Sequence, residues 1–299
     1  MCETILCTLG YMAILYLTYP LSAVAIVTLA LGLGVWITRK FQLDWRLYWI
    51  GGAIFILSQV FHIPFNVGLT ILFRRGILSV PPTAWLTLFN AVILGLSAGL
   101  FEEFARYVVF RWWTKDARSW RKGLLLGAGH GGMEALIIGL LVLYTFIRMI
   151  ALRGVDLSTI VLPNQLITAQ EQITAYWSAT WYQSLLPAVE RLFTLVCQVS
   201  LAVIVLQAFT RRQIRWLWLA VLWHACLDAS AVYSVSLWGI YITEGIVGIC
   251  ALVSLIIIFL LRQPEPVEIP IEKLPIPKLT ITPVEVEETA EKLDNTRYN

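Results

Sequence analysis

Apolar residues occupy most of the chain in long blocks, and polar turns separate the blocks. A helix needs about 20 apolar residues to cross the ~30 Å hydrocarbon core of a bilayer. Seven stretches reach that length, at residues 11–37, 47–73, 84–113, 123–150, 185–209, 215–234 and 237–261. Few polar residues interrupt 215–261, so its division into two spans has alternatives. The pattern predicts an all-α fold, a polytopic transmembrane helix bundle.

Composition and charge divide the chain into two parts. The hydrophobic share is 59% and the charged share 14%, against about 45–50% and about 25% in an ordinary soluble domain. A soluble globule is therefore excluded. Residues 263–299 hold eight acidic and four basic residues and six of the twelve prolines. We expect a membrane bundle at 1–262 and a disordered, Pro- and Glu-rich cytoplasmic tail at 263–299.

The basic residues of the short loops predict an orientation. Lys and Arg are retained on the cytoplasmic side of a membrane protein. Twelve of them flank one set of span ends, at 39–46, 111–122, 211–215 and 262, and four flank the other set. We therefore expect a multi-pass protein of the cell membrane, with its N-terminus outside and its C-terminus in the cytoplasm. Topology and contact with membrane lipid explain these basic loops, and no nucleic-acid partner is expected.

The longest predicted outer loop, residues 154–184, contains glutamines and then four aromatic residues. We interpret its second half as an amphipathic helix that rests at the interface. The aromatic side chains are expected at the level of the lipid headgroups, namely Tyr176, Trp177, Trp181 and Tyr182.

Ionisable side chains inside the spans are the candidate functional residues, because a charge in hydrocarbon is costly and persists mainly where it has a role. Glu102, His130 and His224 each lie eight or nine residues from the nearest cytoplasmic basic residue. At ~1.5 Å per residue, all three lie roughly 12–14 Å into the membrane. Three spans thus present ionisable groups at one level, which indicates a composite site.

Spacing within each span places further polar groups beside these three. Residues four apart share one face of a helix. The pairs with this spacing are Glu102 and Arg106, His130 and Glu134, and His224 and Asp228, while Glu103 lies three residues before Arg106. Each of the three spans therefore offers one convergent polar face.

Two imidazoles with nearby carboxylates suit a divalent transition ion, typically Zn²⁺, that keeps one position for water. The candidate ligands are His130, His224, Asp228 and Glu134, and Glu134 is equally suited to orient His130. A neighbouring carboxylate such as Glu102 can act as general base on the water. The structural alternatives are a charge cluster that holds helices together and histidines that are merely hydrogen-bonded in the core.

Other residues in the spans have simpler interpretations. His62 lies deeper in the second span, where packing and a lining role both remain open. Glu190 and Arg191 are interpreted as an interhelical pair. The glycine-rich run 127–132 allows either close backbone approach or a water-lined opening, and the GxxxG spacing at 95–99 predicts helix packing.

Three blocks carry a resemblance to a known family: FEEFARY at 101–107, GHGGMEA at 129–135 and HACLD at 224–228. Together they resemble the YhfC-type family of intramembrane metalloproteases. That family is similar to the wider CPBP group, which includes prenyl-protein (CAAX) endoproteases and bacteriocin-processing or immunity proteins. The resemblance implies that Glu102 and His130 activate the attacking water. It also implies supporting roles for Glu103 and Arg106, and that His224 and Asp228 complete the site.

This chain departs from the wider group at three positions. Its arginine, Arg106, lies one residue closer to the glutamate pair, Leu126 replaces an aromatic residue, and Asp228 replaces an asparagine. An asparagine can donate a hydrogen bond to an oxyanion, whereas an ionised aspartate only accepts. Asp228 therefore favours metal ligation or orientation of His224.

The expected function is that of an intramembrane metal-dependent endopeptidase whose substrate is a membrane-embedded or membrane-associated peptide. Its site is expected to open towards the cytoplasmic half of the membrane. Two alternatives from other classes use the same residues. One is a proton- or cation-coupled transporter, and the other is a catalytically inactive immunity or scaffold protein of the membrane.

Overall fold

The computed structural model describes residues 2–264, with side chains from residue 13 onward. Within that range the chain contains helices and no strand, and seven helices are long and apolar enough to cross a membrane. They are α1 (Cys2–Phe41), α2 (Arg46–Arg74), α3 (Thr83–Trp112), α4 (Trp120–Ala151), α6 (Leu186–Thr210), α7 (Arg215–Trp238) and α8 (Ile240–Leu260). The all-α, seven-span prediction is confirmed. The predicted tail lies outside the described residues.

The boundary between the last two spans differs from the prediction. It falls at Gly239, so that α8 begins at Ile240, three residues after the predicted start of the last span. Gly239 has φ 80°, a left-handed conformation that glycine adopts without a steric penalty. A single glycine thus ends one apolar helix and begins the next, which hydropathy alone does not locate.

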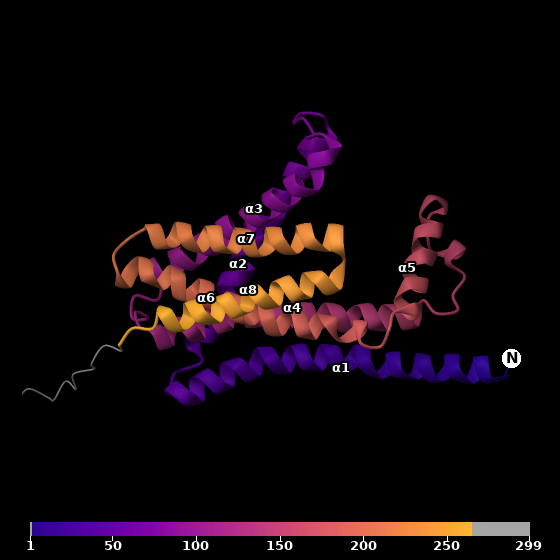
Figure 1. The fold of residues 1–299 in the computed structure, drawn as a ribbon, viewed down its shortest axis with the longest axis horizontal. Helices are drawn as coiled ribbons and strands as arrows, with labels where there is room; N and C mark the ends of the chain where they lie inside the picture. The colour runs from indigo at the N-terminus through magenta and orange to yellow at the C-terminus, as the bar shows by residue number, and fades with distance from the viewer. Residues whose placement is uncertain (1, 265–299) are drawn as a thin grey trace, which may run out of the picture. The chain divides into compact units, whose positions relative to one another are not determined.

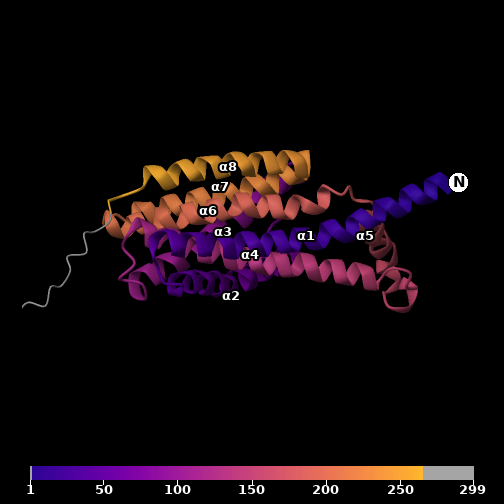
Figure 2. The same ribbon diagram turned by 90° about the horizontal axis from the view of Figure 1, so that it is seen from below.

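Helix α6 lies at the centre of the bundle. Its most apolar stretch is 72% buried, against 39% or less in every other candidate span. It contacts α4, α8, α7, α1 and α3, while α1 packs along α4 and α3 packs along α7. Figures 1 and 2 show these pairs side by side, and Figure 1 shows the α2–α3 turn lying away from the other helix ends. The three site-bearing helices α3, α4 and α7 therefore surround one face of α6.

Glycines allow α4 to lie very close to two neighbouring helices, α2 and α6. A Cβ atom at Gly129 would overlap the backbone carbonyl of Tyr48 on α2. On the opposite side, a Cβ atom at Gly131 would lie 2.8 Å from Cβ of Gln198 on α6. Of the two readings of the run 127–132, close approach is the one observed. It fixes the backbone on both sides of His130.

The GxxxG spacing in α3 has the predicted role in packing. A Cβ atom at Gly99 would lie 2.6 Å from the carbonyl oxygen of Val221 on α7, and one at Gly95 would lie 2.5 Å from that of Ala225. Small residues at such positions let helix backbones approach closely in a membrane. The approach places the Glu102 turn of α3 against the His224 turn of α7.

Basic residues from several loops meet at one end of the bundle. Arg46 and Asp116 form an ion pair at 3.1 Å. The guanidinium of Arg121 lies 5.3 Å from the ring centre of Phe41, and that of Arg262 lies 5.4 Å from the ring centre of Trp120. The Arg46 guanidinium, which donates a hydrogen bond to Asp116, holds the pKa of that carboxyl below its ordinary value. Which side of the membrane this end faces stays a prediction.

The loop between α4 and α6 contains the expected short helix, α5 (Leu166–Ser178). The four aromatic residues expected at the level of the lipid headgroups differ from one another in their contacts, and their level in the membrane stays a prediction. Tyr176 stacks on Tyr19 of α1 with ring centres 4.2 Å apart, and Trp177 packs against Tyr16 and is only 9% exposed. Trp181 is 48% exposed. Two of the four rings thus attach the loop to α1, because a neighbouring aromatic face was available.

Candidate active site

Three helices bring Glu102, His130 and His224 together, as equal depth in the sequence predicts. Nε2 of His130 lies 2.9 Å from Oε2 of Glu102, at hydrogen-bond distance. Nε2 of His224 lies 3.9 Å from the same oxygen. An ionised carboxylate only accepts, so His130 is the donor. Glu102 Oε2 is thus the point at which α3, α4 and α7 converge.

The second carboxylate, Glu103, holds the rest of the cluster. Its Oε1 accepts hydrogen bonds from His224 Nδ1 at 2.7 Å and from Arg106 Nη1 at 2.5 Å. The other terminal nitrogen of Arg106 donates to Gln198 on α6 and lies 3.8 Å from Glu102 Oε2. Each glutamate therefore has its own imidazole, and one guanidinium lies between the two.

Burial gives this cluster its electrostatic character. Glu103, Arg106 and His130 are 0% exposed, and Glu102 and His224 are 6% and 3% exposed. Two carboxylates and one guanidinium leave one negative charge when both imidazoles are neutral. Removing an uncompensated charge from water costs several kcal/mol. One extra proton on an imidazole would balance the cluster.

A cavity adjoins the cluster on the side of His224. It has a volume of about 110 Å³, and His224 and Asp228 of α7 line it together with residues of α4, α6 and α8. Asp228 Oδ2 lies 3.6 Å from His224 Nε2, and the Asp228 side chain is 43% exposed. The nitrogen of His224 that does not bond to Glu103 therefore faces this cavity. The room suffices for a few waters, at roughly 30 Å³ each.

The spacing of four residues predicted that Glu134 would orient His130 or share a metal with it. The structure instead pairs Glu134 with two residues of α6. Its carboxylate accepts hydrogen bonds from Arg191 Nη1 at 2.5 Å and from Gln198 Nε2 at 2.8 Å. Arg191 also donates to its neighbour Glu190 on α6 at 2.5 Å. The pairing between helices that was predicted for this group is the bond from Arg191 to Glu134 on α4. Glu134 thus belongs to a second polar cluster, which Gln198 joins to Arg106.

Two neutral residues that the sequence reasoning did not single out complete the surroundings of Glu102 and Arg106. Gln59 Nε2 donates to Glu102 Oε1 at 3.0 Å. Gln198 accepts from Arg106 and donates to Glu134. Both lie within predicted spans, where an amide without a partner is costly. This free-energy cost is the feature of the sequence that could have identified Gln59 and Gln198. The cost is smaller for an amide than for a charged group, so the indication is weaker.

His62, for which packing and lining were both open, packs against α3 and hydrogen-bonds to its neighbours, and it lines neither the cavity beside His224 nor the larger cavity at the α2–α3 hairpin. Its ring stacks on Phe101 with centres 5.7 Å apart. Its Nδ1 lies 3.4 Å from Gln59 Oε1, and its Nε2 lies 2.8 Å from Nδ2 of Asn66. His62 is thus connected to Glu102 through Gln59.

In the described part of the chain, seven apolar helices surround a buried cluster of carboxylates and imidazoles, which defines a polytopic membrane protein with titratable side chains inside its spans. Residues 24–251 match the family described as YhfC intramembrane metalloprotease. The chain belongs to this family.

A curated relative in Bacillus subtilis (strain 168), described as the uncharacterized membrane protein YhfC, is 28% identical over 210 residues. The alignment covers 68% of this chain and 79% of the relative. No solved structure matches the chain. The comparisons establish the family and the membrane location, and the roles of the individual site residues stay predictions.

The family description implies a metal, so we compared the cluster with the requirements of one. Zinc binds imidazole nitrogen and carboxylate oxygen at about 2.0–2.2 Å. Here His130 and His224 each bond directly to a glutamate, at 2.9 and 2.7 Å, and Arg106 brings a positive charge to the same place. Among the described residues, no group of three His, Cys, Asp or Glu side chains is arranged to hold a metal ion. As arranged, the residues do not fit a bound metal.

Proposed function

We propose that the chain is an intramembrane endopeptidase in which Glu102 is the general base. A water molecule near Glu102 Oε2 attacks the carbonyl carbon of a peptide bond and transfers its proton to the carboxylate. The proton then moves to the amine nitrogen as the C–N bond breaks, so that Glu102 is regenerated. The substrate class is a membrane-embedded or membrane-associated peptide, because the site lies within the spans.

The pairing of Glu102 with His130, beside a cavity, supports this proposal most strongly. A general base needs a fixed position within hydrogen-bond reach of its water. His130 on α4 and Gln59 on the adjacent α2 hold the two oxygens of Glu102, at 2.9 and 3.0 Å. His224 Nε2 lies beside both Glu102 and the cavity, where it can donate to the oxyanion that forms on the carbonyl.

The remaining residues have positioning roles in the proposal. Glu103 accepts from His224 Nδ1 and thereby orients the other nitrogen of that ring towards Glu102. Arg106 neutralises part of the charge of the two glutamates. Asp228 faces the same nitrogen at 3.6 Å and favours its protonated form. No step is assigned to a metal, and the zinc predicted from the sequence is tested separately below.

The test compares peptides released from membranes of cells that carry the native chain or the Glu102→Gln variant. Glutamine keeps the size and the hydrogen bonds of Glu102 but is not a base. Acid–base catalysis contributes about 10²–10⁴ in rate, so the variant should lose the products. Glu190→Gln, the same chemical change in the second cluster, is the matched control and should retain them.

Identical peptide profiles from the native chain and Glu102→Gln, at equal protein levels, would remove the peptidase proposal. The transporter and the inactive scaffold would then remain. They are separated by whether Glu102→Gln changes any phenotype of the cell, because an inactive scaffold does not need the carboxylate.

A further inference from the structure

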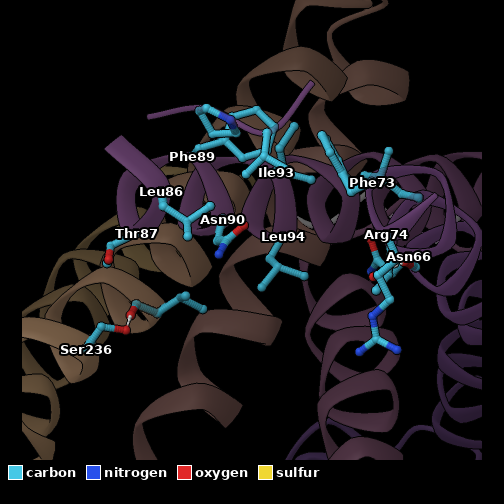
Figure 3. Close-up of a pocket in the computed structure, with 15 residues that line it drawn as sticks. Asn66, Phe73, Arg74, Leu86, Thr87, Phe89, Asn90, Ile93, Leu94 and Ser236 are labelled. Carbon is cyan, nitrogen blue, oxygen red and sulfur yellow. Dashed lines mark hydrogen bonds between the residues drawn. The ribbon is translucent and has the colours of Figure 1, made fainter. Parts of the chain in front are cut away.

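A second and larger cavity lies at the far end of α2 and α3. Its volume is about 520 Å³, and residues of α2, α3, α7 and the α2–α3 loop line it. Nine of the fifteen lining residues are apolar, and the six polar or charged ones are Asn66, Thr70, Arg74, Thr87, Asn90 and Ser236. Figure 3 shows Thr87 and Asn90 between Ser236 at one end and Asn66 and Arg74 at the other. We name this cavity the hairpin groove. Water at roughly 30 Å³ per molecule would fill it with more than ten molecules.

Helices α2 and α3, which form the hairpin, each carry a polar stripe, and part of each stripe lines this groove. On α2 the stripe is Gln59, His62, Asn66, Thr70 and Arg74, at intervals of three or four residues. Residues at such intervals share one helix face. Apolar neighbours such as Val67 and Ile71 occupy another face and are 53% and 42% exposed. An amphipathic face on a membrane span indicates contact with a wet cavity, because lipid offers no hydrogen bonds.

On α3 a matching stripe contains Thr83, Thr87, Asn90 and Ser97. Asn90 is exposed and Thr87 half-buried, and both line the groove. Ser97 Oγ donates to Asn66 Oδ1 at 3.2 Å, so the two stripes meet at the inner end of the groove. The polar surface therefore narrows from an open groove to a buried contact between α2 and α3.

From that contact a chain of hydrogen bonds continues to Glu102. Asn66 Nδ2 donates to His62 Nε2 at 2.8 Å, so His62 carries its proton on Nδ1 and donates to Gln59 Oε1 at 3.4 Å. Gln59 Nε2 then donates to Glu102 Oε1 at 3.0 Å. Each donor in the series points towards the carboxylate. Such an aligned series strengthens its members and favours negative charge at its end.

We propose that the hairpin groove is filled with water and that Asn66, His62 and Gln59 connect it to Glu102 by direct hydrogen bonds, which position the carboxylate of Glu102. The role of His62 as a positioning residue for Glu102 rests on the proposed peptidase function. The wet groove does not, because its accessibility can be measured without any substrate.

The first experiment measures the groove alone. The five native cysteines are replaced by alanine, and single cysteines are introduced as Asn66→Cys, Thr70→Cys, Val67→Cys and Ile71→Cys in the full chain in membranes. A charged methanethiosulfonate reagent reacts with the thiolate, which forms in water and not in lipid. We expect the two groove cysteines to react at least tenfold faster than their lipid-facing neighbours at the same depth. Equal rates at all four positions would overturn the proposal.

The second experiment tests the connection to Glu102. His62→Phe keeps a ring against Phe101 and removes the polar contacts with Gln59, Ser97 and Asn66. His62→Gln restores a donor and an acceptor. We expect His62→Phe to lower product release about tenfold with unchanged thiol reactivity in the groove, and His62→Gln to recover part of the loss. Asn66→Leu, which breaks the chain one residue earlier, should repeat the loss if His62→Phe fails to fold.

The outcomes separate the two proposals. Product release within twofold of native in the folded His62→Phe and Asn66→Leu variants, while Glu102→Gln abolishes it, would overturn the connection. If Glu102→Gln itself changes nothing, the peptidase proposal fails, and the thiol rates still decide whether the groove is wet.

Discussion

The bundle contains two polar clusters, each with one arginine and two glutamates. The clusters differ in how the arginine balances the charges of the two carboxylates. In the first, Arg106 lies between Glu102 and Glu103, and all three are nearly inaccessible. In the second, Arg191 bonds to Glu134 and Glu190 at 2.5 Å each, and the two carboxylates are 22% and 42% exposed. The second arginine satisfies both of its partners. The first leaves Glu102 dependent on histidine and glutamine.

On the proposed function, this difference assigns a structural role to the second cluster and the chemistry to the first. A guanidinium that donates to two carboxylates joins α4 to α6 and leaves little reactive capacity. In the first cluster, Oε2 of Glu102 bonds to an imidazole and lies 3.8 Å from Arg106, too far for a direct hydrogen bond. A carboxylate held by groups that can exchange protons is a better base than one locked by arginine. Gln198 bonds to both clusters and couples their positions.

The largest effect is expected when each arginine is removed. Arg106→Met leaves two buried glutamates without their cation and should lower the free energy of unfolding by about 3–5 kcal/mol. Arg191→Met should cost about 1–2 kcal/mol, since its partners reach solvent in the cavity. Thermal unfolding in detergent measures both. Equal losses would contradict the contrast between the clusters.

A smaller effect is expected from Gly129→Ala, which tests the backbone contact beside the first cluster. The added Cβ atom meets the carbonyl of Tyr48, and overpacking of this kind costs about 1–3 kcal/mol. The control is Gly68→Ala on α2, where a Cβ atom meets nothing within 4 Å among the described residues. That change should stabilise the helix by up to about 1 kcal/mol. Unfolding midpoints of the two variants should therefore move in opposite directions.

Arg46 and Asp116 form an arginine–carboxylate ion pair that is exposed to water. Its contribution to the free energy of unfolding should be smaller than that of either buried cluster. Both side chains are 55% exposed, so the pair contributes less than about 1 kcal/mol. The pKa of Asp116 is lowered by Arg46, so this contribution is present above the ordinary pKa of about 3.9 and is lost as the pH falls through the folded value. Asp116→Asn should therefore be slightly less stable than native at pH 7 and equal to it in acid. A difference that grows on acidification would contradict this sign.

No effect is expected from metal removal, since the imidazoles bond directly to glutamates. Purified protein should contain much less than one zinc per chain by elemental analysis, and a chelator should leave its unfolding midpoint unchanged. One zinc per chain that is lost in His224→Ala would contradict the arrangement described above. It would show that the clusters separate to admit a metal.

Hydropathy was sufficient to predict the fold, because seven long apolar blocks leave little choice of architecture. Equal depth brought Glu102, His130 and His224 together, because charged groups in lipid are few and their positions along a helix convert directly to height. Glu134 was misplaced for a physical reason. Its spacing set its helix face correctly, but Arg191 on a neighbouring helix determined its partner. The amides Gln59, Asn66 and Gln198 are uncharged, so the sequence gives little reason to select them as site residues. Their hydrogen-bond partners are known only from the three-dimensional structure.

The backbone contacts of α4 also restrict how the site can open. Gly129 lies against the backbone of α2, and Gly127 lies against the backbone of α6, where an added Cβ atom would be 2.8 Å from Cα of Val199. These contacts hold α4 on two sides. If a peptide enters between His130 and Glu102, as the proposed function requires, we therefore expect α3 to move and α4 to stay in place. Gly95 and Gly99 bring α3 equally close to α7. We therefore expect α3 and α7 to move together as one rigid unit, so that Glu102 and His224 move with them.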